Sequence, residues 1–378
     1  MWGIPYPNGL KSFRVPSMRI HRRVSVLASL SLMAVLAGIV IPTSAQAAIR
    51  LPAAESNLFI LDVSGSTNSI ELWKTLKISA TSKLGQPFGH PTANGIPKKL
   101  PAYVSITSIA KNSQNSPTFS IVTKADAKKI WGAVEQVFPN STDSRLKRIT
   151  EEIFGDSGVW ASQARIFTRS TIVVPTSAAC RTSTLNAINK GSFLRNTDQQ
   201  NKNVLASAIC ERVISVAKSM NQANSYFSNP VCDPSAICSD IAGAIYRATN
   251  MAADLAGTDR DTVNGRLVKN KLCIAIASDM LNESPGVSRT SVLNSKHIAM
   301  TARTLENASA AGMAAAKSVG IKFTSEVETR VVMVGIGTGQ NPLPLDRNSY
   351  LLAYWEGFFT QSGVKQTDQA QSLNQACS

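Results

Sequence analysis

Unbroken apolar runs, each ending in a polar turn, constrain the fold of this chain more than any other feature. They are Leu58–Leu61, Leu272–Ala277 and the part of the predicted strand Thr329–Ile336 that begins at Val331. A strand that is apolar along its whole length has both faces covered, as in a parallel sheet between two layers of helices. Segments with helical spacing, such as Ile241–Leu255 and Asn348–Gln361, alternate with these runs. We therefore predict an α/β fold with a doubly wound, mostly parallel sheet flanked by helices.

The remaining segments add one hairpin and several helices to this sheet. Ala102–Ala110 and Thr118–Val122 alternate as two strands around a short turn, which predicts an antiparallel pair. Arg169–Val174 is a further candidate strand, and the polar stretch 181–203 is expected to be a surface loop. Further helices are predicted at Lys124–Val137, Ser144–Phe154, Val204–Met220 and Ser295–Val319.

The N-terminus indicates export. Residues 1–47 carry five cations and no acid, with an apolar run at Val24–Ile41 and an Ala-x-Ala sequence ending at Ala47. This order is typical of a secretory signal peptide, with cleavage expected after Ala47. The alternative is an uncleaved N-terminal membrane anchor, because the apolar run is just long enough to span a bilayer. We expect a secreted or cell-envelope protein, and the style of the signal suggests a bacterial source.

The mature chain is expected to form one enlarged domain. Residues 48–57 would be a linker, 58–363 the α/β domain, and 364–378 a C-terminal tail. Residues from about 139 to 237 would be a helical and loop insertion in the domain, and the sequence assigns them no function.

Charge narrows the choice of partners. Without the five cations of residues 1–47, 34 Lys and Arg remain against 24 Asp and Glu, a net charge of +10. The cations are dispersed, and no arginine-rich arm or basic stretch with interleaved aromatic residues occurs. Attraction to anionic envelope polymers or lipids would be unspecific. Nucleic acid is not an expected partner, because export separates the protein from most of it.

Six cysteines in an exported chain suggest disulfides, and six allow fifteen pairings. Cys232 and Cys238 are close in sequence and form the first candidate pair, followed by Cys180 with Cys210. Cys273 lies in a predicted buried strand, so a packed free thiol is an equal alternative there. Without a Cys-x-x-Cys or a nearby His, a zinc site is not expected.

The turn after the first apolar run carries the chemistry. Asp62, Ser64 and Ser66 offer three oxygen side chains at alternate positions just beyond a strand. Hard cations such as Mg²⁺ take oxygen ligands and keep open positions for water or a carboxylate. The carboxyl ends of strands are also where open α/β sheets bind ligands. The alternative is a turn that only caps the following helix, without a metal.

This turn resembles the Asp-x-Ser-x-Ser loop that begins the metal-ion-dependent adhesion site of von Willebrand factor type A domains. Later segments continue the resemblance: Ser239 precedes a helix, Asp279 ends a core strand, and Val331–Gly337 is similar to the family's valine-rich strand and its glycine exit. The likeness covers residues 57–123 and 238–363. It departs at Met280, where a glycine commonly follows the aspartate, and at Ser239, where a threonine is more frequent.

The resemblance implies a ligand set for Mg²⁺, or for Mn²⁺ or Ca²⁺. Ser64 and Ser66 would bind the cation directly. Asp62 and Asp279 would bind it directly or through water, and Ser239 or its water would complete the protein's share. An acidic side chain of a protein partner would take the open position. Taken alone, Ser239 is equally explained as a helix cap, and Asp279 as a turn residue.

The sequence gives less support to an enzymatic function, and we expect a binding protein without catalytic residues. A phosphohydrolase of the haloacid dehalogenase type would use Asp62 as its nucleophile, but Ser64 stands where its second aspartate belongs. His90 and His297 are the histidines of the mature chain, and neither lies in a catalytic pattern. A third reading is a type A scaffold that has no functional metal site.

Overall fold

The structure is a computed structural model, and Met1–Ala45 forms a separate unit outside its described part. The described residues are 55–64, 69–84, 104–122, 124–155, 157–228, 239–256, 262–263, 266–267, 270–283, 287–338, 342–373 and 375–377.

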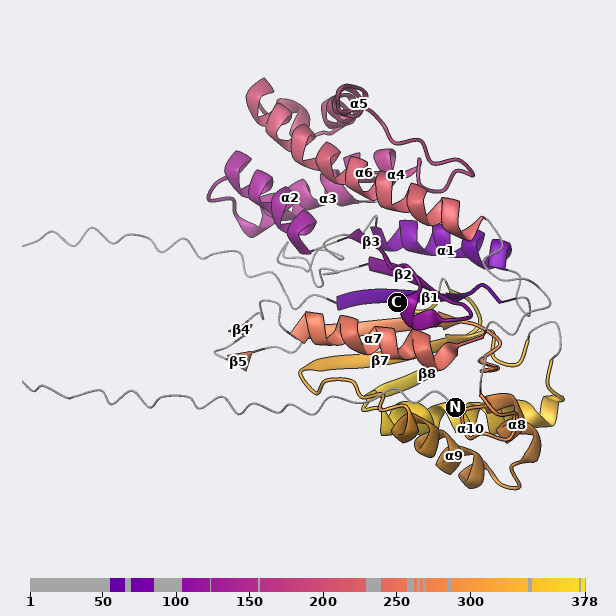
Figure 1. The fold of residues 1–378 in the computed structure, drawn as a ribbon. Helices are drawn as coiled ribbons and strands as arrows, with labels where there is room; N and C mark the ends of the chain where they lie inside the picture. The colour runs from indigo at the N-terminus through magenta and orange to yellow at the C-terminus, as the bar shows by residue number, and fades with distance from the viewer. Residues whose placement is uncertain are drawn as a thin grey trace, which may run out of the picture. The chain divides into compact units, whose positions relative to one another are not determined.

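A six-stranded sheet forms the centre of the fold, and all its neighbouring strands run parallel except the β2–β3 pair (Figure 1). The central strand β1 lies between β2 and β6, so that Leu58 faces Ser105 on one side and Ile274 on the other. The predicted doubly wound, mostly parallel sheet is confirmed. Across the sheet the strands are β3 (Phe119–Val122), β2 (Val104–Ile109), β1 (Glu55–Asp62), β6 (Asn270–Ala277), β7 (Val327–Val334) and β8 (Gln366–Ala370).

One face of the sheet packs against α1 and the helices of the predicted insertion. Phe59 and Leu61 belong to this core, and Trp73 of α1 stacks on Phe227 of α6 with ring centroids 5.0 Å apart. The insertion therefore buries a face of the central sheet. The helices on this face are α1 (Ser69–Leu84), α2 (Lys124–Val137), α3 (Asp143–Phe154), α4 (Val159–Ala164), α5 (Ser177–Lys190) and α6 (Gln199–Phe227), of which α3 to α6 lie in the predicted insertion.

The other face carries a second core, to which the alternate residues Leu58 and Ile60 of β1 contribute. Figure 1 shows α7 along the sheet and α8, α9 and α10 beyond it. None of the helices in the described part of the chain has the length and apolarity needed to cross a bilayer. The helices of this layer are α7 (Ile241–Ala256), α8 (Ser295–Thr301), α9 (Leu305–Ser318) and α10 (Asn348–Gln361).

Short elements complete the fold. Two of them matter below: η1 follows β2, and η3 precedes α10. They are the 3-10 turns η1 (Ser113–Asn115), η2 (Leu194–Asn196) and η3 (Leu345–Arg347), and the two-stranded pair β4 (Thr262–Val263) and β5 (Arg266–Leu267).

Several local predictions were wrong. The expected loop 181–203 contains most of α5 and the start of α6, and Arg169–Val174 forms no strand. The expected single helix Ser295–Val319 is broken between α8 and α9, because Ala302 is extended and Thr304 caps α9 by accepting a hydrogen bond from the Asn307 amide. The expected tail contains the edge strand β8.

Two disulfides connect elements that are distant in sequence. Cys180 of α5 is bonded to Cys210 of α6, with Cα atoms 5.7 Å apart, which is one of the pairings suggested by the sequence. Cys273 of β6 is not a free thiol: it is bonded to Cys377, with Cα atoms 5.6 Å apart. This bond holds the C-terminal segment against the sheet. Cys232 and Cys238 lie outside the described residues.

Candidate metal centre

Asp62 ends β1 at the carboxyl edge of the sheet and is fully buried. Its Oδ1 accepts a hydrogen bond of 2.8 Å from the amide of Ser64, which turns the chain away from the strand. Ser64 is buried beside it. Ser66, the third residue of the motif, lies outside the described residues.

The loop after β6 meets Asp62 directly, because Leu61 and Ala277 are partners in neighbouring parallel strands. Ser278 donates a hydrogen bond of 2.7 Å from Oγ to Asp62 Oδ2, so chain donors contact both carboxylate oxygens. The next residue, Asp279, is also buried, and its Oδ1 accepts a hydrogen bond from the Leu281 amide. The fold therefore brings two carboxyl groups from distant segments to one edge.

Met280 shows how the departure from glycine is accommodated. Its φ is 62°, the left-handed conformation that a glycine adopts without strain. Hydrogen bonds hold this backbone: the Met280 carbonyl accepts from Ser295 Oγ at 2.9 Å and from Trp355 Nε1 at 2.8 Å. The Met280 amide donates to Ser278 Oγ at 2.9 Å. The loop thus keeps a glycine-like path despite the larger side chain.

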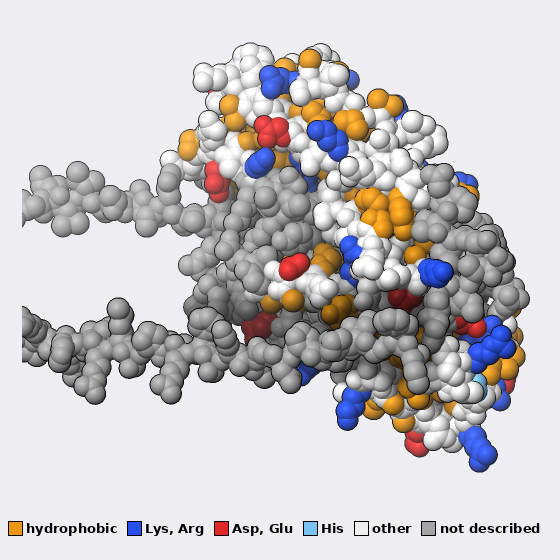
Figure 2. All heavy atoms as spheres, viewed as in Figure 1, with side chains coloured by type: hydrophobic (Ala, Val, Ile, Leu, Met, Phe, Trp, Pro, Cys, Tyr) orange, Lys and Arg blue, Asp and Glu red, His pale blue; other side chains and the backbone are white. Residues whose placement is uncertain are grey.

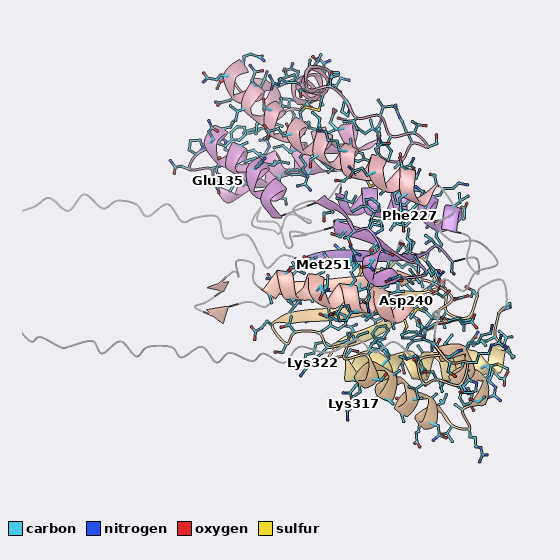
Figure 3. The ribbon with its side chains drawn as sticks, in the orientation of Figure 1. Glu135, Phe227, Asp240, Met251, Lys317 and Lys322 are labelled. Carbon is cyan, nitrogen blue, oxygen red and sulfur yellow. A yellow bond between two sulfur atoms is a disulfide. The ribbon has the colours of Figure 1, made fainter. Side chains whose placement is uncertain are left out.

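Ser239 reaches the same edge from the start of α7. Its carbonyl accepts a hydrogen bond from the Glu283 amide in the loop after β6, and the amide of Asp240 donates to Ala110 just after β2. Since β1 lies between β2 and β6, this segment spans the end of β1, where Asp62 is located. Figure 3 shows Asp240 at the start of α7.

Helix capping does not account for Ser239. Asp240 caps α7 through its Oδ1, which accepts a hydrogen bond of 2.9 Å from the Gly243 amide. Asn282 Oδ1 accepts from the Ile241 amide at 2.8 Å and from Ala242 at 3.3 Å. These two residues supply the helix-capping bonds that a serine in this position could have made. Sequence reasoning missed both of them, as well as Ser278.

The electrostatics of the edge favour a cation. Burial raises the pKa of Asp62 to about 6; hydrogen bonds from Ser64 and Ser278 oppose this, and the negative charge of Asp279 adds to it. Two buried carboxyl groups with neighbouring serine hydroxyls form a hard oxygen donor set, which suits Mg²⁺, Mn²⁺ or Ca²⁺. Because both Asp62 oxygens already accept hydrogen bonds, this residue fits a role through a bound water.

The positions of the acidic residues and of the histidines also bear on the phosphohydrolase hypothesis and on the kind of metal site. Among the described residues no group of three His, Cys, Asp or Glu gathers, so a metal here would depend on serine hydroxyls as well as on the two carboxylates. Asp62, the nucleophile of the phosphohydrolase reading, is fully buried and held on both oxygens. His297 lies in α8, where its amide is bonded to the Asn294 cap, and His90 lies outside the described residues.

Ser278→Ala is expected to weaken Mg²⁺ binding by about 10-fold to 100-fold, the usual effect of removing a partner that orients a metal ligand. The substitution removes the hydrogen bond to Asp62 Oδ2 and keeps both carboxylates. Calorimetric titration of the variant measures the effect, and Ser278→Thr, which retains the hydroxyl, is the matched control. Unchanged affinity in Ser278→Ala would show that Asp62 needs no such support.

Comparison with known proteins adds little to these observations. No family model matches the sequence, and no curated protein is significantly similar to it. A structural match was found to the human COPII-coat protein Sec24c, at 9% sequence identity and a TM-score of 0.28. It covers 85% of this chain and 30% of Sec24c. A likeness at this level carries no argument about fold or function.

Proposed function

We propose that this protein is an exported binding protein of the von Willebrand type A kind, which uses a divalent cation to bind an acidic group of a protein partner. The observation that carries the proposal is the meeting of Asp62 and Asp279, two buried carboxyl groups, at the carboxyl edge of β1 and β6. The hydroxyl-bearing residues Ser64 and Ser239 reach the same edge.

The donor set explains why the partner would be acidic. Ser64 and Ser66 would hold the cation directly, with Asp62 and Asp279 acting directly or through water and Ser239 completing the set. When bound, Mg²⁺ would supply an electrophilic centre with an open position for a carboxylate. With neutral hydroxyls as the direct ligands and the two carboxylates acting through water, the cation stays electrophilic, so an acidic side chain of the partner is the chemistry that fits.

Export is the second part of the proposal. Residues 1–47 have the order of a secretory signal, although they lie outside the described residues. The disulfides Cys180–Cys210 and Cys273–Cys377 are typical of proteins that fold in an oxidising compartment. Figure 2 shows Lys and Arg side chains scattered over the visible face, which suits a diffuse basic surface.

Calorimetric titration with Mg²⁺ tests the proposal. We expect one saturable site in the purified protein and none in Asp279→Asn, with circular dichroism to show that the variant is folded. A phosphatase assay with p-nitrophenyl phosphate runs alongside. Metal-dependent turnover that requires Asp62 would contradict the binding function and support the phosphohydrolase hypothesis. If the protein binds none of Mg²⁺, Mn²⁺ and Ca²⁺, the hypothesis of a type A scaffold without a functional metal site would hold instead.

The affinity for Mg²⁺ is expected to fall as the pH drops through about 6. Burial keeps the pKa of Asp62 near 6 in the metal-free protein, so below that pH the cation must displace a proton from the carboxyl group. The loss should approach tenfold per pH unit. Titrations at pH 7.5, 6 and 5 in buffers of different ionisation enthalpy measure affinity and proton release together. Equal affinity at pH 7.5 and pH 5 would contradict the role of Asp62.

A further inference from the structure

A cavity of about 480 Å³ lies beside α7, over strands β2 and β3. Its size is within the usual range of small-molecule sites. Figure 3 shows Met251, one of its lining residues, well along α7 from Asp240. The cavity therefore lies beside a later part of α7, away from the candidate metal centre at the start of the helix.

The sheet beneath the cavity is unusually polar. Ser105 is the register partner of Leu58 in β1 and of Ser120 in β3, and all three line the cavity. Thr107, two residues further along β2, also lines it and donates a hydrogen bond of 2.9 Å to the Pro117 carbonyl. On this face β2 presents Ser105 and Thr107 and β3 presents Ser120 to the cavity, whereas Leu58 and Ile60 of β1 are aliphatic. Such a surface suits a polar ligand better than a packed helix.

Two opposite charges stand over this polar floor. Arg247 and Asp254 both line the cavity and lie seven positions apart on α7, about 10 Å along the helix axis. The ion pairs found among the described residues include neither of them. The site therefore offers a cation at one end and an anion at the other.

Arg247 is fixed in place by neutral acceptors. Its Nε donates a hydrogen bond of 2.6 Å to Thr118 Oγ1, and its Nη1 donates one of 3.1 Å to the Gln114 carbonyl. These bonds use two of the five guanidinium donors and leave the positive charge uncompensated. Partial burial of the guanidinium lowers the pKa of Arg247. An anionic group can thus bind a preorganised guanidinium.

We propose that this cavity binds a short peptide with free ends, its carboxylate on Arg247 and its ammonium group on Asp254. An extended tripeptide spans about 10 Å at 3.3–3.6 Å per residue, which matches the spacing of the two charges along α7. The hydroxyls of Ser105 and Ser120 offer hydrogen-bond partners to the peptide groups. The inference is independent of the cation, because none of these residues belongs to the metal ligand set.

Calorimetric titration of the purified protein with Ala-Ala-Ala in the presence of EDTA tests this inference. We expect saturable binding that weakens at least tenfold when the peptide is N-acetylated or C-amidated. Asp254→Asn should weaken Ala-Ala-Ala binding to the same extent, while the N-acetylated peptide binds the variant and the parent equally. Asp346→Asn, the same substitution at an exposed position of η3 outside the cavity, should change nothing.

Three results would overturn the inference. They are the absence of binding at millimolar Ala-Ala-Ala, equal binding of the free and the N-acetylated peptide, and binding of neutral maltose with the same sensitivity to Asp254→Asn. The last would assign the cavity to carbohydrates. Because EDTA removes divalent cations, none of these outcomes depends on whether the candidate metal centre is functional.

Discussion

Replacing Asp62 by Asn is expected to stabilise the metal-free protein at pH 7 by about 3 kcal/mol, which corresponds to a carboxyl pKa raised from 3.8 to about 6. Below pH 3.8 the carboxyl group is protonated in both states and costs nothing. Between 3.8 and about 6 the unfolded chain ionises first, so stability falls as the pH rises, and above 6 the full cost is present. An asparagine avoids the free-energy cost of a buried charge, and its Oδ1 can still accept the hydrogen bond from the Ser64 amide.

Mg²⁺ should offset the stability advantage of Asp62→Asn over the parent. At a concentration of about 100 times Kd, the cation stabilises the parent by about 2.7 kcal/mol and leaves Asp62→Asn unchanged. Denaturant unfolding at pH 4 and pH 7, with and without Mg²⁺, measures each effect, and Asp346→Asn controls for the loss of a charge. A metal-free Asp62→Asn variant that is no more stable than the parent at pH 7, or equal stabilisation of both proteins by Mg²⁺, would contradict this role of Asp62.

The second large effect concerns the disulfide between Cys273 and Cys377, which are separated by 104 positions. Closing a loop of this size restricts the unfolded chain by about 4–5 kcal/mol in the chain-entropy description. The bond also holds the C-terminal segment, in which Leu373 and Ala376 are buried against the sheet. Replacing both cysteines by Ala should therefore cost about 2–5 kcal/mol of unfolding free energy.

The other disulfide is the matched comparison. Cys180 and Cys210 are separated by 30 positions, so the same description gives a smaller loss, by about 1 kcal/mol. Denaturant unfolding of the two double Ala variants measures both losses. If the Cys273–Cys377 variant kept the stability of the parent, the C-terminal segment would not depend on its covalent bond.

The sequence predicts the central sheet well because its strands are buried on both faces. Leu58–Leu61 and Leu272–Ala277 lack polar interruptions, and packing dominates their conformation. It predicts the periphery poorly. In α5 only Cys180, Thr184 and Ile188 are buried, so its composition reads as a loop although its spacing is helical. The edge strand β8 is polar and partly exposed, and it has no periodic apolar signal.

The candidate site was also predicted only in part from the sequence. The spacing of Asp62 and Ser64 after a strand was visible in the sequence, and so was the aspartate that ends β6. The supporting residues were not visible, because their role depends on strand register. Ser278 reaches Asp62 because Leu61 and Ala277 are neighbours across two parallel strands, and Asn282 caps a helix that begins 41 positions earlier.

A crystal structure of the protein with Mn²⁺ tests the central claim most directly. The account predicts one anomalous-difference peak at the carboxyl edge of β1 and β6, about 2.0–2.6 Å from the hydroxyl oxygens of Ser64 and Ser66. Asp62, Ser239 and Asp279 should contact the ion directly or through ordered water, and Asp279→Asn crystals should lose the peak. An ion-free edge in Mn²⁺-saturated crystals, with Asp62 still hydrogen-bonded to Ser64 and Ser278, would contradict it.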